Sequence, residues 1–162
     1  MTAVDDMAPQ VRLRPATPRD AALLLVWRND PVAVRFSVTG RAVDPDEHAS
    51  WMASRLADPA TRLWIAEEDG VPAGQVRVHL EAGTGTVSVA VAPNRRGRGV
   101  GSAMLRAMLK EAERDPETLR LRALAHAENT ASIRAFERTG FRREGSEEGG
   151  FVVLERALGP KS

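Results

Sequence analysis

Hydrophobic positions near the start of the chain first alternate and then take a helical spacing. Residues 11–14 alternate as in a short strand, and Pro15 ends it. Residues 17–20 and 44–47 each combine a Thr or Asp cap with a following Pro and an acid, which is typical of a helix start. Apolar residues three or four positions apart follow both segments. The pattern predicts one strand followed by two helices.

The middle of the chain has the period of two that is typical of strands. Apolar and polar residues alternate at 63–65, 76–78 and 87–91. Asp69-Gly70 separates the first two segments, and residues 83–85, which contain two glycines, separate the second from the third. These residues predict an antiparallel meander joined by hairpin turns.

A basic, glycine-rich turn at 93–101 opens the last third of the chain. It leads into a long amphipathic helix that Asp115-Pro116 ends. Gly140 is placed to close a second helix. The elements expected after the long helix are a strand at 119–125, a helix at 130–138, and strands near 141–144 and 151–156.

The order of these elements predicts the fold class. A single α+β domain is expected, with a mixed, mostly antiparallel sheet of about seven strands and about four helices. No internal repeat or linker interrupts the pattern. We expect the domain at 11–157, between a flexible N-terminal tail at 1–10 and a C-terminal tail at 158–162.

Composition and charge exclude several function classes. The 162 residues are 43% hydrophobic and 28% charged, as in an ordinary globular protein, and the net charge is +1. This balance predicts no bulk attraction to nucleic acid or membrane, so an anion site must be local. The N-terminus has no secretory signal pattern, and the apolar run at 21–27 is too short to span a bilayer. We expect a cytoplasmic protein that is a monomer or a homodimer.

The chain contains neither cysteine nor tyrosine. The absence of cysteine excludes disulfides, thiolate metal sites and a covalent cysteine intermediate. The absence of tyrosine excludes a phenol as general acid. The spacing of His48, His79 and His126 suggests no metal site, so none is expected.

The glycine-rich turn has the features of a pyrophosphate site. Its three glycines let backbone N–H groups approach a ligand, and the helix that follows offers unpaired N–H donors. Arg95, Arg96 and Arg98 add positive charge. A P-loop would need a lysine here, and a dinucleotide fingerprint would need a glycine in place of Ser102. The alternative is a flexible basic turn, which the combination of glycines, arginines and strand–helix setting disfavours.

These residues resemble the GNAT superfamily of N-acetyltransferases. Its motif of Arg or Gln, two residues, Gly, one residue, and Gly or Ala matches Arg96, Gly99 and Gly101. A second family segment matches 129–141, and the resemblance extends over about 11–156. It implies a single-domain GNAT fold and acetyl-coenzyme A (acetyl-CoA) as the acetyl donor, with a small-molecule amine as acceptor.

The resemblance also implies which residues hold acetyl-CoA. The loop would bind the pyrophosphate, and the backbone of the strand ending near Val91 would bind the pantetheine. Asn129 binds the cofactor in the family, although it is also a good helix N-cap. The expected cofactor-binding residues are Val89, Val91, Arg96, Gly97, Arg98, Gly99, Val100, Gly101, Ser102 and Asn129.

Direct attack of the amine on the thioester is the expected chemistry, because the chain has no cysteine. Many family members place a tyrosine acid where this chain has Phe136, which its spacing favours as a core residue. Ser132 matches a serine that is assigned the acid role in ribosomal-protein N-terminal acetyltransferases. A solvated first-turn hydroxyl is the open alternative for Ser132. Candidates for the general base stay open among Glu67, Glu68, Glu81, His79 and His48.

The acceptor is expected to contact the first two helices. The residues there are similar to those of amino-sugar nucleotide N-acetyltransferases of pseudaminic acid synthesis, which makes Trp27, Arg28, Arg35 and His48 candidate acceptor-binding residues. Burial of Trp27 and solvation of the two arginines are the open alternatives. An arginine-lined site would suit a sugar nucleotide, whereas an acidic one would suit a basic peptide or an aminoglycoside. A CoA-binding module without turnover is the alternative of another class.

Overall fold

Seven strands form one mixed sheet in the computed structural model, which describes residues 8–160 apart from the side chains of 145–148. The order across the sheet is β1-β2-β3-β4-β5-β7-β6. Every neighbouring pair is antiparallel except β4 and β5. The strands are β1 (Val11–Pro15), β2 (Thr61–Glu68), β3 (Val71–Glu81), β4 (Thr84–Val91), β5 (Arg120–His126), β6 (Arg142–Glu148) and β7 (Phe151–Ala157).

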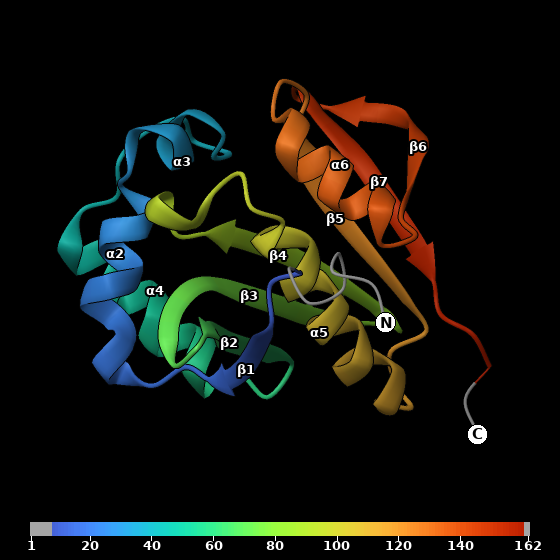
Figure 1. Ribbon diagram of the computed structural model, residues 1–162, viewed down its shortest axis with the longest axis horizontal. Coiled ribbons are helices and arrows are strands. Elements are labelled where there is room, and N and C mark those ends of the chain that lie inside the picture. Colours follow the sequence, from blue (N-terminus) through green and yellow to red (C-terminus); the bar gives the residue numbers. More distant parts are fainter. Residues whose placement is uncertain (1–7, 161–162) are drawn as a thin grey trace.

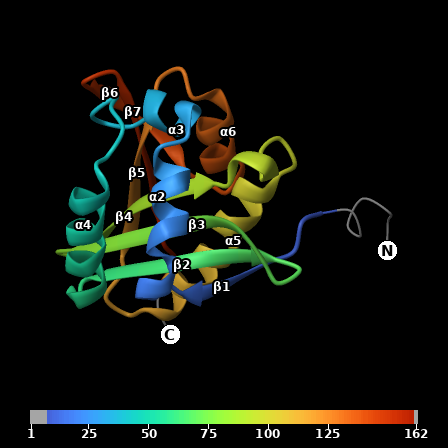
Figure 2. The same ribbon diagram turned by 90° about the vertical axis from the view of Figure 1, so that its left-hand side faces the viewer.

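Helices cover both faces of the sheet (Figures 1 and 2). One face carries α2 and α4, and the other carries α5 and α6. The helices are α2 (Ala21–Arg28), α3 (Pro31–Arg35), α4 (Pro45–Ala57), α5 (Val100–Arg114) and α6 (Thr130–Arg138), with 3-10 turns η1 (Pro18–Asp20) and η2 (Pro93–Arg95). No helix among residues 8–160 is both long enough and apolar enough to cross a membrane.

The predicted fold class is confirmed, with two local differences. The second hairpin turn lies at Ala82 and Gly83, one residue earlier than predicted, because these are the residues with positive φ (50° and 83°). The sequence pattern also missed α3, which has only five residues and no buried apolar side chain. Of the predicted tails at 1–10 and 158–162, residues 1–7 and 161–162 lie outside the described residues, whereas Leu158 donates its N–H to the carbonyl of Leu119.

Two hydrophobic clusters hold the layers together. The larger lies between the sheet and α5 and α6, where Met104, Leu105 and Met108 are fully buried. The smaller lies between the sheet and α2 and α4, around Trp27 and Met52. Alternation along β2 sends Trp64 and Ala66 to the larger cluster and Leu63 and Ile65 to the smaller one.

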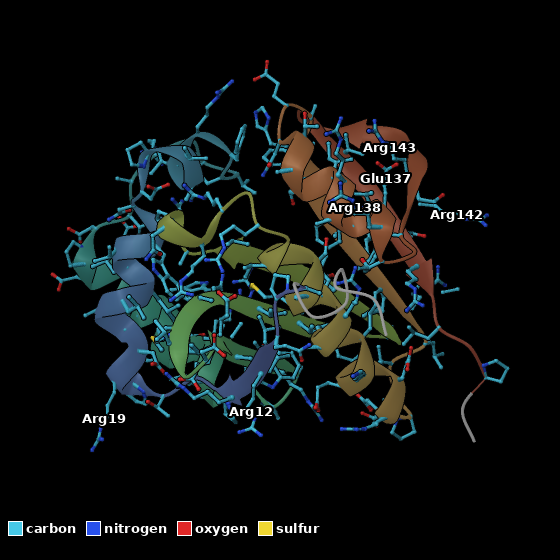
Figure 3. All side chains as sticks on the ribbon, viewed as in Figure 1. Arg12, Arg19, Glu137, Arg138, Arg142 and Arg143 are labelled. Atoms are coloured by element: carbon cyan, nitrogen blue, oxygen red, sulfur yellow. The ribbon has the colours of Figure 1, made fainter. Side chains whose placement is uncertain are left out.

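Charged side chains protect the two edges of the sheet. Arg12 is exposed on β1, and Arg142 and Arg143 are exposed on β6 (Figure 3). Charges on edge strands oppose pairing with a second sheet, because association would bury them without partners. The open backbone of each edge is therefore a poor template for aggregation.

The pairing of β4 with β5 sets the position of the candidate site. The parallel ladder runs only from Thr84↔Arg120 to Val87↔Ala123. Beyond it β4 continues beside β3 alone and β5 beside β7 alone, so the two strands diverge (Figure 1). The backbone groups of 88–91 that face β5 therefore have no strand partner among the described residues.

Helix α5 lies directly on β3 at Gly74. A Cβ atom there would lie 2.5 Å from the carbonyl oxygen of Ala90 and 2.7 Å from Cε of Met104. The methionine can change rotamer, but the carbonyl belongs to the β3–β4 ladder and cannot move freely. This close approach fixes the distance between α5 and the strands that lead into the site.

Gly74→Ala is therefore expected to lower the free energy of unfolding by ~1–3 kcal/mol through overpacking. Urea denaturation would measure the change. Gly159→Ala is the control, because nothing lies within 4 Å of the added methyl group. Equal stability of the two variants would contradict the tight seating of α5.

Candidate active site

The loop between β4 and α5 has the backbone conformation that its glycines predict. Gly97 and Gly99 have φ values of 78° and 81°, in the left-handed region that favours glycine. Gly99 is the N-cap of α5 and has no side chain to satisfy the first-turn N–H groups. These groups, at Val100, Gly101 and Ser102, lie beside the end of β4, beyond the point where β4 and β5 diverge, and are available to an anion.

Close packing holds the start of α5 in place. A Cβ atom on Gly101 would lie 3.4 Å from Cγ2 of Val91 and 3.9 Å from Cβ of Ala135. The first turn of α5 therefore touches both the end of β4 and α6. The Val100 side chain is buried in the core, so only its backbone can face a ligand.

Carboxylates tie down all three arginines of the loop. Glu68, at the end of β2, accepts hydrogen bonds from Nη1 of Arg95 (2.6 Å) and from Nη2 of Arg98 (2.9 Å). Arg96 pairs with Asp30, with 2.8 Å between Nη2 and Oδ2. One carboxylate faces two guanidinium groups at Glu68, so this part of the loop keeps a net positive charge.

Short helix α3 connects the loop to the far side of the opening. Asp30 caps α3 by accepting from the backbone N–H groups of Val32 and Ala33. At the other end of α3, Arg35 pairs with Glu128 at 3.1 Å, in the connection between β5 and α6. Burial acts to raise the pKa of Asp30, but Arg96 and the α3 backbone outweigh it and lower the pKa.

Ser132 and Ala135 lie on the same face of α6. Asn129 is the N-cap of α6, and its Oδ1 accepts from the backbone N–H of Ser132 at 3.2 Å. Ser132 lies one turn before Ala135, which contacts the start of α5, and residues three apart share a helix face. Phe136 is 2% exposed and meets the ring of Phe141, so it is a core residue.

The predicted acceptor-binding residues do not all converge. Trp27 is 7% exposed and belongs to the smaller hydrophobic cluster, whereas Arg35 is exposed on α3. Arg28 and His48 do lie together: burial lowers the pKa of His48, and the positive charge of Arg28 lowers it further. The structure thus keeps Arg28 and His48 as a pair beside the sheet and gives Trp27 a packing role.

The sequence pattern did not single out two polar residues of β3 on the α4 side of the sheet. Gln75 and Arg77 alternate with Val76 and Val78, whose side chains lie in the larger cluster on the α5 side. The Arg77 guanidinium lies over the ring of Trp51, 5.2 Å from its centroid. Their polar character was the signal in the sequence, because a strand that is covered on both faces is expected to carry apolar side chains on both.

Four of the five candidate bases already have charged partners or lie at the surface. Glu67 pairs with Arg14, and Glu68 with Arg95 and Arg98. Nδ1 of His79 lies 2.9 Å from Thr61 and 3.5 Å from Asp58. Glu81 is exposed, which leaves His48 as the candidate that is buried near Arg28. In the part of the chain that the structure describes, no three His, Asp or Glu side chains converge as metal ligands would.

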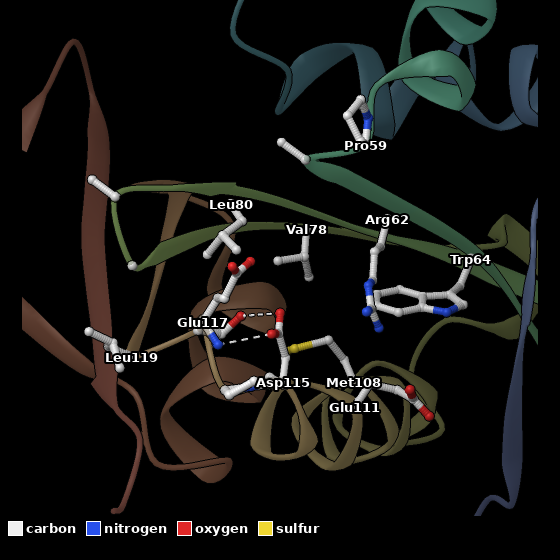
Figure 4. Close-up of a pocket in the computed structure, with 16 residues that line it drawn as sticks. Pro59, Arg62, Trp64, Val78, Leu80, Met108, Glu111, Asp115, Glu117 and Leu119 are labelled. Atoms are coloured by element: carbon white, nitrogen blue, oxygen red, sulfur yellow. Dashed lines mark hydrogen bonds between the residues drawn. The ribbon is translucent and has the colours of Figure 1, made fainter. Parts of the chain in front are cut away.

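A separate cleft of about 730 Å³ lies at the opposite end of α5 (Figure 4). Trp64, Val78, Leu80 and Met108 are among its apolar lining residues. None of the residues predicted for the site lines it. The cleft is therefore distinct from the opening between β4 and β5.

Comparison with known proteins gives this arrangement a family. Residues 10–142 match the family model for an acetyltransferase (GNAT) domain. The chain belongs to the GNAT acetyltransferases. It is an N-acetyltransferase, as the motif at Arg96, Gly99 and Gly101 predicted.

Similar GNAT proteins differ in the acceptor that their names give. An aminoglycoside N(6′)-acetyltransferase type 1 of Klebsiella pneumoniae is 28% identical over 152 residues, with 84% of this chain and 76% of that protein covered. The structure of AAC(6′)-Ib with ribostamycin and coenzyme A has a TM-score of 0.81 at 23% identity, covering 91% of this chain and 93% of that one. RimL, a ribosomal L7/L12 α-N-protein acetyltransferase, has a TM-score of 0.80 at 16% identity, covering 94% and 96%. The two structures show the shared GNAT fold.

Glu68→Gln tests how the GNAT loop is held. The amide keeps the shape of the side chain but removes the charge that faces Arg95 and Arg98, and hydrogen bonds to charged groups contribute about 1.5–3 kcal/mol. We expect the free energy of unfolding to fall by ~1–3 kcal/mol in urea denaturation. Glu81→Gln, at an exposed position, should leave it unchanged within ~0.5 kcal/mol. An unchanged stability of Glu68→Gln would mean that these ion pairs do not hold the loop.

Proposed function

We propose that this protein transfers the acetyl group of acetyl-CoA directly to a primary amine on a small, sugar-like molecule. One observation carries the proposal: the opening between β4 and β5 ends at the glycine loop and at the uncapped start of α5. The unpaired backbone of β4 is thus followed directly by the N–H groups at the start of α5, which can bind an anion. A long donor with an amide-containing arm and a pyrophosphate needs that combination.

The residues present fit coenzyme A. The unpaired backbone groups of 88–91 suit the amides of an extended pantetheine. The N–H groups of Val100, Gly101 and Ser102 suit a pyrophosphate, and the arginines beside them add positive charge. Bound acetyl-CoA supplies an acetyl group activated as a thioester.

The proposed reaction transfers the acetyl group from the thioester sulfur to the amine nitrogen in one direct step. A bond forms between the amine nitrogen and the acetyl carbon, the carbon–sulfur bond breaks, and the amine proton leaves to solvent. The chain supplies no cysteine for a covalent relay, so both reactants must be held together. Ser132 is the residue that we assign to donate a proton to the departing sulfur, and its hydroxyl regains a proton from solvent. It lies in the first turn of α6 and is half-buried.

Two features support a sugar-like acceptor. The Klebsiella relative is named for acetylating the amine of an aminoglycoside, which is an amino sugar. The aromatic and arginine side chains of Trp51 and Arg77 lie on the sheet face beside Ser88, the first residue of β4 in the opening. Amino sugars and their nucleotide-linked forms share the amine and the ring that such a surface would contact.

A thiol-release assay tests the proposal. Purified protein with acetyl-CoA and a panel of amino sugars should release coenzyme A at a rate that depends on the acceptor. Calorimetry should show binding of acetyl-CoA without any acceptor. Binding of acetyl-CoA without release for any amine would favour a CoA-binding module, and no binding at all would remove the assignment of the loop.

Ser132→Ala tests the proton donor. Loss of a positioned acid typically lowers a rate by ~10²–10⁴-fold, so we expect kcat to fall into that range while the Kd for acetyl-CoA is unchanged. Ser50→Ala, at an exposed position on α4, is the control. A kcat equal to that of the control would exclude Ser132 from the proton transfer.

A further inference from the structure

The face of the sheet beneath α2 and α4 carries a cluster of positive and aromatic side chains. Arg28 lies near His48 on α4, and the ring of His48 lies 5.5 Å from that of Trp51. Trp51 in turn lies under the guanidinium of Arg77 on β3. The four residues form a continuous row from α2 to the middle of the sheet. We call this row the arginine row.

We infer that the arginine row binds an anionic group, a phosphate or a carboxylate, on the acceptor molecule. The inference rests on the proposed function, because it names the kind of amine that this acetyltransferase takes. Arg77 is the residue that contacts the anion, and Arg28 adds positive charge at the other end of the row.

Arg77 lies beside the start of the opening between β4 and β5. Arg77 pairs in register with Ser88, which is the first residue of β4 beyond its ladder with β5. The Arg77 side chain lies on the α4 side of the sheet, as its contact with Trp51 shows. An anion on Arg77 would therefore be held beside the start of the opening.

Among the described residues, Arg77 and Arg28 also lack the carboxylate partners that neighbouring arginines have. The other arginines around the opening have carboxylate partners: Arg35 with Glu128, Arg96 with Asp30, and Arg95 and Arg98 with Glu68. Within residues 8–160, Arg77 and Arg28 have none. Nη1 of Arg28 is buried and has no hydrogen-bond partner in that range, and neither has Oε1 of Gln75, two residues before Arg77.

The cost of this arrangement is visible in the pKa values. Burial lowers the pKa of Arg77, and the neighbouring positive charge of Arg55 lowers it further. Burial also lowers the pKa of Arg28. A guanidinium without a counter-charge in a half-buried position destabilises the folded state, and an anionic ligand would remove that penalty.

Contact with Trp51 explains how Arg77 is held but not what it binds. The ring lies on one side of the planar guanidinium group and restricts its movement. The N–H donors lie in that plane, where they can bind two oxygens of one anion. A polycationic aminoglycoside would meet like charges here, so the acceptor differs in charge from that of the Klebsiella relative.

Matched acceptors test the inference. Initial rates of thiol release are measured with glucosamine, glucosamine 6-phosphate and ribostamycin as the probes. Wild-type protein should have a kcat/KM for the phosphorylated sugar at least about tenfold above that for the neutral one, because one charge-assisted contact contributes about that factor. Arg77→Gln should abolish the preference through KM, and Arg77→Lys should restore part of it. Arg106→Gln, at an exposed position on α5, should change nothing.

Binding of inorganic phosphate gives a readout that does not need turnover. Calorimetry with saturating coenzyme A, which fills the loop, should show phosphate binding to wild-type protein and about tenfold weaker binding to Arg77→Gln. Arg77→Met should raise Tm, because it removes an uncompensated charge; a lower Tm would indicate a structural role instead.

The outcomes separate the two proposals. Transfer to glucosamine and its phosphate with equal kcat/KM, unaffected by Arg77→Gln, would overturn the arginine row and leave the acetyltransferase proposal standing. Phosphate binding that depends on Arg77, with no transfer to any amino sugar, would support the row and overturn the sugar-like acceptor. Preference for ribostamycin would overturn the row as well.

Discussion

The parallel ladder between β4 and β5 holds for four residue pairs and then ends, and the candidate site depends on that ending. Each strand keeps its outer neighbour, so the sheet stays continuous while its centre opens. Continuous pairing would have consumed the backbone groups of 88–91 and left the start of α5 facing a closed strand. The larger cluster contains buried residues of both halves, from β3 and β4 as well as from β5 and β7, and so joins the halves on one face of the sheet.

Charge around the opening is distributed unevenly. On the donor side, Glu68 and Asp30 balance most of the positive charge of the loop, which keeps three neighbouring arginines from repelling one another. On the acceptor side, Arg77 lies over the ring of Trp51 and near the positive charge of Arg55, and Arg28 lies near His48. The proposed donor and acceptor would thus meet at a boundary between compensated and uncompensated charge.

Local signals in the sequence predicted most of the fold. The meander, the long helix and the cap at Asn129 depend on residues a few positions apart, and all of these elements are present. Contacts between distant residues could not be predicted this way. Glu68 meets Arg95 across 27 positions, and Trp51 meets Arg77 across a layer of the fold. Burial of Trp27 likewise depends on how α2 lies on the sheet, which a single sequence does not contain.

Asp30 has two tasks at once, because its carboxylate both caps α3 and pairs with Arg96. An anion that binds Arg96 replaces the Asp30 carboxylate in the ion pair. Asp30 then keeps only its hydrogen bonds to the backbone of α3. The other end of α3 reaches the β5–α6 connection through Arg35. Thermodynamic linkage then makes the effect reciprocal: whatever shifts α3 changes the affinity of the loop by the same factor by which loop binding shifts α3. The short helix that the sequence did not reveal thus couples the glycine loop to the β5–α6 connection.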